Sequence, residues 1–430
     1  MNRSMLPPAG RATAKRSVSN RPVWAGAALA APLLVALLLA LLLAACAAPT
    51  PTPEPVSIRF VIPAADVDYT KGLVEQFRKT NPNVQVELVG RRWDPLTGID
   101  ASGADVLLTS QFALDELRRR GALVSLDALM AGDKDLNPAD FLPNALKMFV
   151  DSGKTWALPA GLDPQVVYFN KDFFDKRGVP YPDANWTRDD FLQKVLQLRD
   201  PATGTFGYAI ASDFLDPILF VYQHGGRLFD DLQNPTRTTF TDPKTIEAVE
   251  WYAKLLQEEG AVLTPEVAQS LGLGNLQNAL RAGKSAMWIG PLSARGGRLD
   301  RAPWPMKWGM APLPRDAQAA TTATATGYAI TTQCKKSLTC WQFVSFLSKQ
   351  APNSFAPARR SLVKSAAGQD AEVAKIAQAS VDSSLMIRSA DLAQLSKAID
   401  AFTAAVGEVV SGKASAAEAL TAAQQASPLQ

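Results

Sequence analysis

Histidine is nearly absent from this sequence of 430 residues, which contains only His224. Catalysis by a Ser-His-Asp or Cys-His group needs a histidine beside the nucleophile, and the sequence has no G-x-S-x-G stretch. It also lacks H-E-x-x-H, the Walker A loop and G-x-G-x-x-G. His224 stands before a Gly-Gly turn, where a polar residue at a helix end accounts for it. We therefore predict no catalytic residue and no cofactor.

Cysteine is also scarce, with Cys46, Cys334 and Cys340 in all. Two cysteines with five residues between them and one distant histidine cannot complete a four-ligand zinc site, so no metal is expected. If Cys46 is used as an anchor, an even pair remains, as an oxidising compartment favours. We predict a Cys334–Cys340 disulfide, with two free thiols as the alternative.

The body of the chain carries almost no net charge. Of the 44 basic residues, five lie among the first 45 residues, which hold no acid; this leaves 39 basic against 41 acidic residues. A nearly neutral body has no electrostatic footprint for nucleic acid. No nucleic-acid partner is expected.

One long uncharged run is present, from Val23 to Cys46. About 20 apolar residues can cross a bilayer, so a transmembrane anchor is one interpretation. The basic start and small-residue end are typical of a secretory signal, and Leu43-Ala44-Ala45-Cys46 resembles a bacterial lipobox. We predict a lipoprotein signal peptide over 1–45, lipidation of Cys46, and a Pro/Thr spacer over 46–56. Under either interpretation the body lies outside the cytoplasm.

The pattern after the spacer is that of an α/β layer. Residues 57–62 and 84–88 alternate as strands, and 105–109 is a short apolar run typical of a buried parallel strand. Helices are predicted over 68–78 and 112–120. This order indicates parallel strands joined by crossover helices.

Helix signals continue through the rest of the chain. Thr187 and Asp190 resemble a capping box, and Asp242-Pro243 is an N-cap followed by proline at the first helical position. A further helix is predicted over 275–283 and a strand over 286–289. The last fifty residues are rich in alanine and favour helix.

Five fragments lie in order between residue 57 and about residue 365. They read FRKTNPNVQVELV, ADVLLTSQFALDELRRRGALVSLDAL, SGKTWALPAGLDPQVVYFNKDFFDKRGVPYPDANWTRDDF, LRAGKSAMWIGP, and WGMAPLP with GYAIT. Together they resemble the carbohydrate-type family of ABC-importer solute-binding proteins, the group that includes maltose-binding protein.

The resemblance implies an α/β periplasmic-binding-protein-like fold of two lobes, with a hinge and a ligand cleft between the lobes. We expect chain crossings near Pro159–Asp163, Gly290–Trp304 and 350–357. Lobe one would comprise 57–161 plus 303–350, and lobe two 163–300 plus 357–430.

The implied function is binding, not catalysis. The resemblance predicts a lipid-anchored monomer on the extracytoplasmic face of a bacterial cell membrane. It would deliver a small solute, a sugar or polyol, to the permease subunits of an ABC transporter. A lipid-anchored glycoside hydrolase remains an alternative, because paired carboxylates leave no local motif. A binder of peptide or polyamine is another.

Candidate ligand residues follow from the chemistry of sugars, whose hydroxyls favour planar polar partners and whose C–H faces favour aromatic rings. Ser110 and Gln111 follow a parallel strand at its carboxyl end, where open α/β sheets bind ligands; the alternative is a helix N-cap. Asp163, eight residues before Lys171, matches an acidic ligand residue of the maltose-binding branch; the alternative is a hinge-turn residue.

Other candidates rest on the resemblance alone. Asp213 and Phe214 precede the Gly-Gly turn as that branch's second-lobe site segment does, with helix cap and core as the alternative. The family's stacking aromatic corresponds here to Leu292, a departure that counts against a maltodextrin ligand. The remaining candidates are Trp288, Tyr328, Trp93 and Arg359, for which core or surface roles are the alternative.

Overall fold

A computed structural model describes residues 55–94, 97–210, 214–258, 260–298, 302–365, 371–388 and 392–429. The predicted signal peptide, Cys46 and most of the spacer lie outside the described residues, as does Asp213. Residues from Pro55 onward form one compact unit. Among the described helices, none combines the length and apolar character that a membrane span requires.

The strands of the described chain form one large sheet and a small hairpin. They are β1 Val56–Pro63, β2 Val84–Arg91, β3 Val106–Ser110, β4 Val150–Asp151, β5 Lys154–Thr155, β6 Leu158–Asn170, β7 Phe206–Ala209, β8 Val262–Leu263, β9 Ser285–Pro291, β10 Trp308–Ala311, β11 Thr321–Ile330, β12 Ala356–Pro357 and β13 Ser384–Leu385.

The helices lie around this sheet. They are α2 Val67–Thr80, α3 Gln111–Arg119, α4 Asp127–Gly132, α5 Pro143–Lys147, α6 Lys171–Arg177, α7 Arg188–Leu198, α8 Leu215–Gln223, α9 Pro243–Gln257, α10 Pro265–Ser270, α11 Leu276–Arg281, α12 Ser337–Ser348, α13 Arg360–Ser365, α14 Ala371–Asp382, α15 Leu392–Val410 and α16 Ala416–Ala426, with short 3-10 turns η1 Ala64–Asp66, η2 Pro138–Asp140 and η3 Leu292–Gly297.

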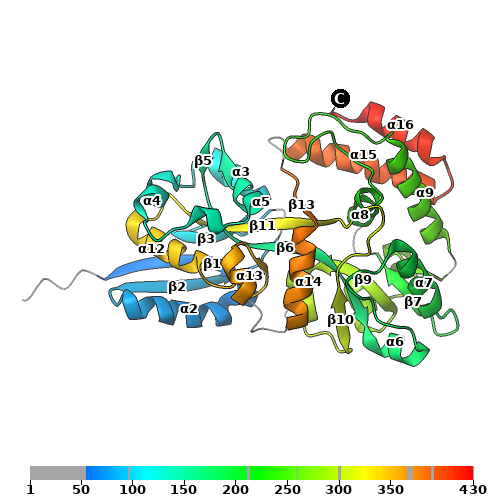
Figure 1. The fold of residues 1–430 in the computed structure, drawn as a ribbon, viewed down its shortest axis with the longest axis horizontal. Coiled ribbons are helices and arrows are strands. Elements are labelled where there is room, and N and C mark those ends of the chain that lie inside the picture. The colour runs from blue at the N-terminus through cyan, green and yellow to red at the C-terminus, as the bar shows by residue number, and fades with distance from the viewer. Residues whose placement is uncertain are drawn as a thin grey trace, which may run out of the picture. The chain divides into compact units, whose positions relative to one another are not determined.

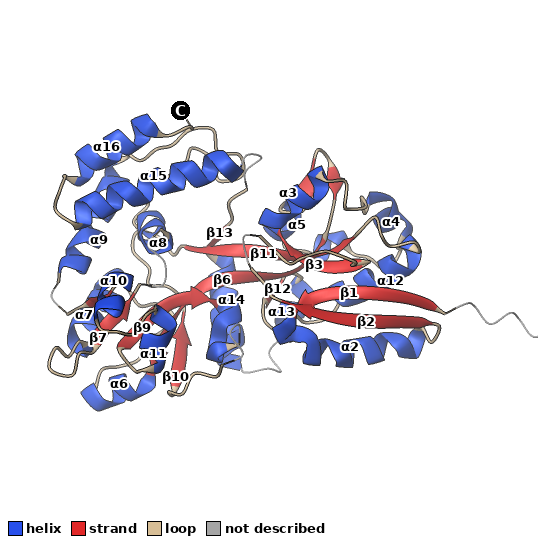
Figure 2. Ribbon diagram, turned by 180° about the vertical axis from the view of Figure 1, so that it is seen from behind, coloured by secondary structure: helices blue, strands red, loops and turns tan. Residues whose placement is uncertain are grey.

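The sheet runs through the whole described body in the order β2-β1-β3-β11-β6-β9-β7-β8. β1 pairs with β2 and β3 in parallel, as the sequence predicts. The two long strands β11 and β6 then join antiparallel to their neighbours. Figure 1 shows helices α2, α3, α4, α5 and α12 with β1–β3 on one side, and α6 to α9, α15 and α16 with β7 and β9 on the other. We call these sides the first half and the second half; β6 and β11 belong to both (Figure 2).

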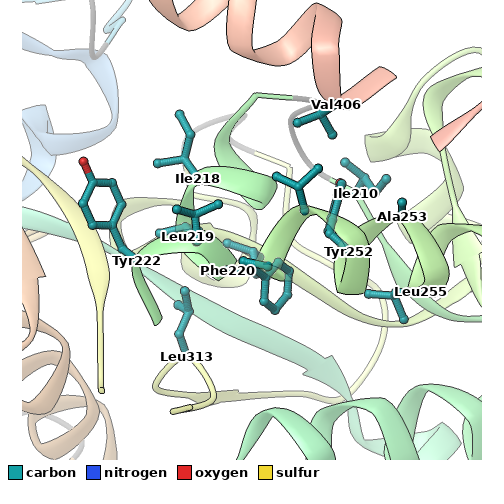
Figure 3. Packing of buried hydrophobic residues seen from close by; sticks show 14 of the residues in the cluster. Ile210, Ile218, Leu219, Phe220, Tyr222, Tyr252, Ala253, Leu255, Leu313 and Val406 are labelled. Atoms are coloured by element: carbon teal, nitrogen blue, oxygen red, sulfur yellow. The ribbon is translucent and has the colours of Figure 1, made fainter. Parts of the chain in front are cut away.

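Each half has its own apolar core. In the first half, Phe60 and Phe77 pack edge-on against Phe343 of α12, with ring centroids 5.3 and 5.0 Å apart. In the second half, Phe220 of α8 packs against Tyr252 of α9, within a cluster that Figure 3 shows. A third cluster contains residues from β6, β9 and β11, and so connects the halves.

Local signals in the sequence form where expected. Thr187 and Asp190 make a capping box at the start of α7. Asp242 caps α9 through the amide of Lys244, with proline next along the chain. The helix predicted over 112–120 is α3, one residue earlier.

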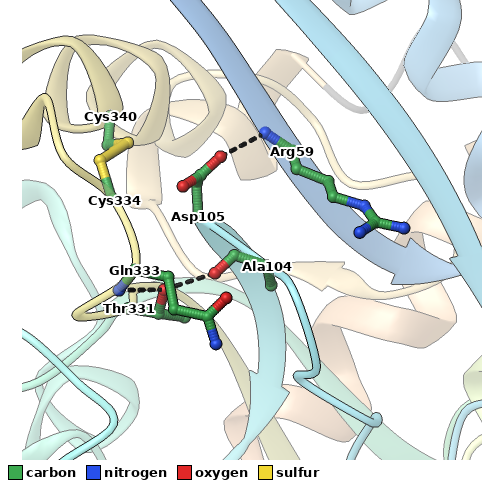
Figure 4. The surroundings of a disulfide bond; sticks show 7 residues. All are labelled: Arg59, Ala104, Asp105, Thr331, Gln333, Cys334 and Cys340. Atoms are coloured by element: carbon green, nitrogen blue, oxygen red, sulfur yellow. Dashed lines mark hydrogen bonds between the residues drawn. A yellow bond between two sulfur atoms is a disulfide. The ribbon is translucent and has the colours of Figure 1, made fainter.

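Cys334 and Cys340 are joined by a disulfide that links the turn after β11 to α12, with their Cα atoms 6.8 Å apart. Figure 4 shows its surroundings, where the Thr331 hydroxyl donates to the carbonyl of Ala104 and the Arg59 amide to the carboxylate of Asp105. The first bond attaches the turn to the residues before β3, and the second attaches β1 to them.

Candidate functional site

Polar side chains meet in two places where the halves join, and the first is buried. We call it the crossing cluster: Asp66, Asp163, Ser293, Arg295, Asn353 and Ser354. These residues come from four chain segments: η1, β6, η3, and the turn before β12.

Asp163 is held by a single partner residue. The Ser293 amide donates to its Oδ1 at 2.9 Å and the Ser293 hydroxyl to its Oδ2 at 2.7 Å. Burial raises the pKa of Asp163 to about 6, although both bonds from Ser293 act in the opposite direction.

Arg295 fastens η3 to the neighbouring turn. Its guanidinium donates to the carbonyl of Leu292 at 3.1 Å, to that of Ser354 at 2.7 Å, and to that of Asn353. Asp66 in turn accepts hydrogen bonds from Asn353 and Ser354, at 3.0 and 2.6 Å. The polar groups of the crossing cluster therefore form hydrogen bonds within the cluster.

Gln111 links the first half to the C-terminal segment. Its amide nitrogen donates to the carbonyl of Ile387 at 2.7 Å, and its amide oxygen accepts from the backbone of Ala325 in β11 at 2.8 Å. β11 pairs with β3 through Thr326 and with β13 through Thr322. The Gln111 side chain thus bonds to the edge of β11 between these two neighbours.

Residues 384–388, which follow α14, lie between the halves (Figure 1). Arg388 donates from its guanidinium to Asp151 of β4 at 3.1 Å and from its amide to the carbonyl of Leu232 at 2.8 Å. Gln233 donates to the carbonyl of Met386 at 2.7 Å. Segment 384–388 is therefore bonded to both halves.

A pocket of about 310 Å³ lies beside this segment. From the first half it is lined by residues of α3, of the turn after α5 and of the β4–β5 hairpin; from the second half, by the loop after α8; and it is completed by the C-terminal segment. We call it the interhalf pocket: Gln111, Phe112, Leu114, Asp115, Met148, Asp151, Ser152, Gln233, Asn234, Ile387, Arg388 and Leu392.

A larger hollow of about 650 Å³ shares Gln233 with the interhalf pocket. Apart from Asn144 and residues 384–386, its walls come from the second half, including Arg227, Lys244 and Asp230. The interhalf pocket is the one with several residues from each half.

Of the predicted ligand residues, Gln111 lines the interhalf pocket. Ser110 is buried, and its hydroxyl accepts from the amide of Ala113 as the N-cap of α3. Asp163 lies in the crossing cluster. Phe214 is 41 % exposed at the start of α8.

The other four predicted residues pack against protein groups. Trp288 is buried, with the ring of Trp304 centred 5.1 Å away. Tyr328 packs against Phe60, and burial raises its pKa. Trp93 contacts the ring of Phe355. The Arg359 guanidinium lies over the ring of Phe141 and pairs with Asp140 at 3.2 Å.

Four further polar residues that line the interhalf pocket were not among the predicted ligand residues: Asp115, Asp151, Asn234 and Arg388. One signal was available, because Asp115 follows Gln111 by four residues and so shares its helix face. In the described part of the chain, no group of three or more His, Cys, Asp or Glu side chains is arranged to hold a metal ion.

Comparison with known families explains this arrangement. The family model described as bacterial extracellular solute-binding protein matches residues 64–353. The chain belongs to this family. Its fold is that of the periplasmic-binding-protein-like proteins: the ABC substrate-binding protein of Listeria monocytogenes in complex with cycloalternan superposes with a TM-score of 0.70, at 21 % identity, over 86 % of this chain and 98 % of the other. Family and fold are those of binding proteins rather than of enzymes.

Two curated relatives are more limited in extent. A binding protein of Brucella abortus is 24 % identical over 253 residues, 57 % of this chain and 59 % of the relative. The match thus spans about three fifths of that relative's length. The erythritol/L-threitol-binding protein of Mycolicibacterium smegmatis is 38 % identical over 58 residues, 14 % of this chain and 12 % of the relative.

Proposed function

We propose that this solute-binding protein captures a small sugar or polyol outside the cytoplasm and delivers it to the permease subunits of an ABC transporter. The observation that carries the proposal is the interhalf pocket, which has polar residues from both halves and an aromatic side chain, Phe112, from the first half. Small-molecule sites form preferentially between domains, where closure surrounds the ligand. The ligand names of the cycloalternan and erythritol/threitol binders support a polyhydroxyl solute.

The lobe boundaries belong to the same proposal. Lobe one would comprise 57–161 plus 303–350, and lobe two 163–300 plus 357–430. The crossings would run through β6, η3 and the turn before β12. Asp163, Ser293 and Arg295 join these segments by hydrogen bonds, as hinge segments that move together require. Asp213, Phe214, Trp288, Tyr328, Trp93 and Arg359 remain proposed ligand residues of this cleft.

Ligand binding can be tested by thermal unfolding of the purified protein with sugars, polyols, peptides and polyamines in turn. A bound ligand stabilises by RT ln(1 + [L]/Kd), or about 2.7 kcal/mol at a hundredfold excess over Kd. We expect the melting temperature to rise with a neutral sugar or polyol and no product to form. Product release would instead support the glycoside hydrolase alternative, and a response to peptide or polyamine alone would contradict the proposal.

Anchoring is the second part of the proposal. We propose that residues 1–45 are a signal peptide and that Cys46 is lipidated, with 46–56 as spacer, so that a monomeric body is held at the extracytoplasmic membrane face. Cys46→Ser should abolish incorporation of labelled fatty acid and leave the leader uncleaved. A mature N-terminus at any other residue would contradict it.

A further inference from the structure

The polar groups that line the interhalf pocket are of two kinds. Some hold the walls together: Gln111 bonds to Ile387, and Asp151 to Arg388. Others have unused acceptors or donors. In the described part of the chain, Oδ2 of Asp115, Oε1 of Gln233 and the whole carboxamide of Asn234 have no hydrogen-bond partner, since Asp115 receives Arg118 on Oδ1 and Gln233 uses its nitrogen. The unused groups come from both halves.

Charge around the pocket is balanced. Asp151 lies 3.1 Å from the Arg388 guanidinium, and Arg118 lies within 3.4 Å of both Asp115 and Asp151. Two carboxylates thus face two guanidiniums. A cationic or anionic solute would add an uncompensated charge, which is costly away from water. The balance favours a neutral solute and counts against a polyamine.

The remaining walls suit a polyhydroxyl compound. Phe112 provides an aromatic side chain and Ile387 an apolar one for C–H groups, and both are half-buried. Planar carboxylate and carboxamide groups suit paired hydroxyls. The volume of about 310 Å³ is at the small end of the range of roughly 300–1,000 Å³ for ligand pockets. This size fits one ring or a short chain.

We propose that the interhalf pocket is the solute site and that it binds one neutral sugar ring or a short polyol. Asp115, Gln233 and Asn234 would bind hydroxyls, while Gln111, Asp151 and Arg388 hold the two walls in place. This inference rests on the proposed solute-binding function and names its site and ligand size.

The test uses substitutions at Asn234, which is exposed and therefore tolerant of change. Titration calorimetry would follow the sugar or polyol that gives the largest thermal shift. Asn234→Ala removes hydrogen bonds and should weaken binding roughly three- to tenfold. Asn234→Trp should fill the pocket and abolish binding. Asn185, an exposed asparagine in the loop before α7, supplies the controls Asn185→Ala and Asn185→Trp, which should bind normally.

A second variant tests the opposite wall. Asp115→Asn keeps the shape but removes the charge, and should weaken binding about tenfold. Unchanged affinity in Asp115→Asn and in both Asn234 variants would overturn the site while the solute-binding function stood. If no sugar or polyol shifts the melting temperature, the function itself is wrong and the site falls with it.

Ligand length provides the last measurement. Glucose, erythritol and maltotriose should be compared by the same titration. A single ring or a tetritol should bind more tightly than the trisaccharide. Tighter binding of maltotriose would overturn the proposed size and would indicate a ligand that extends past Gln233 into the larger hollow.

Discussion

The crossing cluster and the interhalf pocket are both polar, and both join the halves of the sheet, but their hydrogen bonding differs. In the crossing cluster Asp163 is 5 % exposed and both its oxygens accept from Ser293. In the interhalf pocket Asn234 is exposed and its carboxamide has no partner among the described residues. A buried polar group without a partner is costly, so groups of the first kind must be satisfied by the protein itself. Groups of the second kind remain available to a solute.

The largest effect is expected at Arg295 in the crossing cluster. Arg295→Ala removes the guanidinium that donates to the carbonyls of Leu292, Ser354 and Asn353, and with it a positive charge that lowers the pKa of Asp163. We expect a loss of about 3 kcal/mol in the free energy of unfolding, measured by urea denaturation. The neighbouring Arg298 also donates to Asn353 but is exposed, so Arg298→Ala should cost less than about 1 kcal/mol. Equal losses of stability in the two variants would show that burial does not determine how much each arginine stabilises the protein.

The pH dependence of stability should reveal the buried carboxyl. The pKa of Asp163 is about 6 in the folded chain, above its ordinary value of 3.8. Between these values the folded state keeps a proton that the unfolded state releases, so the contribution of Asp163 to stability falls as pH rises from about 4 to 6. Two pKa units correspond to roughly 3 kcal/mol as an upper bound.

Asp163→Asn provides the matched variant, because an asparagine oxygen can still accept from the Ser293 amide and its nitrogen can donate to the hydroxyl. The variant should gain stability relative to the unmodified chain as pH rises from 4 to 7, in denaturation curves recorded at each pH. A constant difference across this range would contradict a raised pKa.

Gln111 combines features of the crossing cluster and of the interhalf pocket, because it lines the pocket and yet has both ends of its side-chain amide hydrogen-bonded to the protein. Gln111→Ala leaves the Ala325 amide and the Ile387 carbonyl without this partner, at a cost of roughly 2 kcal/mol. Gln111→Glu keeps the acceptor for Ala325 but points a carboxylate oxygen at the Ile387 carbonyl, and should be at least as harmful. Hydrogen exchange would show whether residues near Ile387 lose protection. A glutamate variant as stable as the original chain would exclude the bond to Ile387.

The sequence predicts the local elements of this structure but not the contacts between distant residues. Strand and helix positions, the capping box of α7 and the N-cap of α9 follow from neighbouring residues, and they form as predicted. Ser110 and Gln111 stood out because they follow a parallel strand. Arg388 and Asp151 are 237 residues apart and meet only through the path of the chain after α14. No local sequence pattern predicts that contact.

The same limit applies to the candidate residues that rest on the resemblance. Trp288 and Arg359 lie in fragments similar to the family's, and such fragments preserve the path of the backbone. Whether a side chain there meets solute or protein depends on its distant neighbours. In the structure Trp304 lies beside Trp288, and the Arg359 guanidinium lies over the ring of Phe141.

The smallest expected effect concerns Asn234 and separates the two regions most directly. Its side chain is exposed and unpaired among the described residues, so Asn234→Ala should change the free energy of unfolding of the solute-free protein by less than about 0.5 kcal/mol. Arg295→Ala should show the reverse, with a large loss of stability and, in the folded fraction, little change in solute affinity, because Arg295 does not line the pocket. Denaturation of both variants would measure the change in the free energy of unfolding, and titration would measure the change in solute affinity. If Asn234→Ala destabilises the solute-free protein by more than 1 kcal/mol, its carboxamide is structural, and the distinction between satisfied and available groups fails at this position.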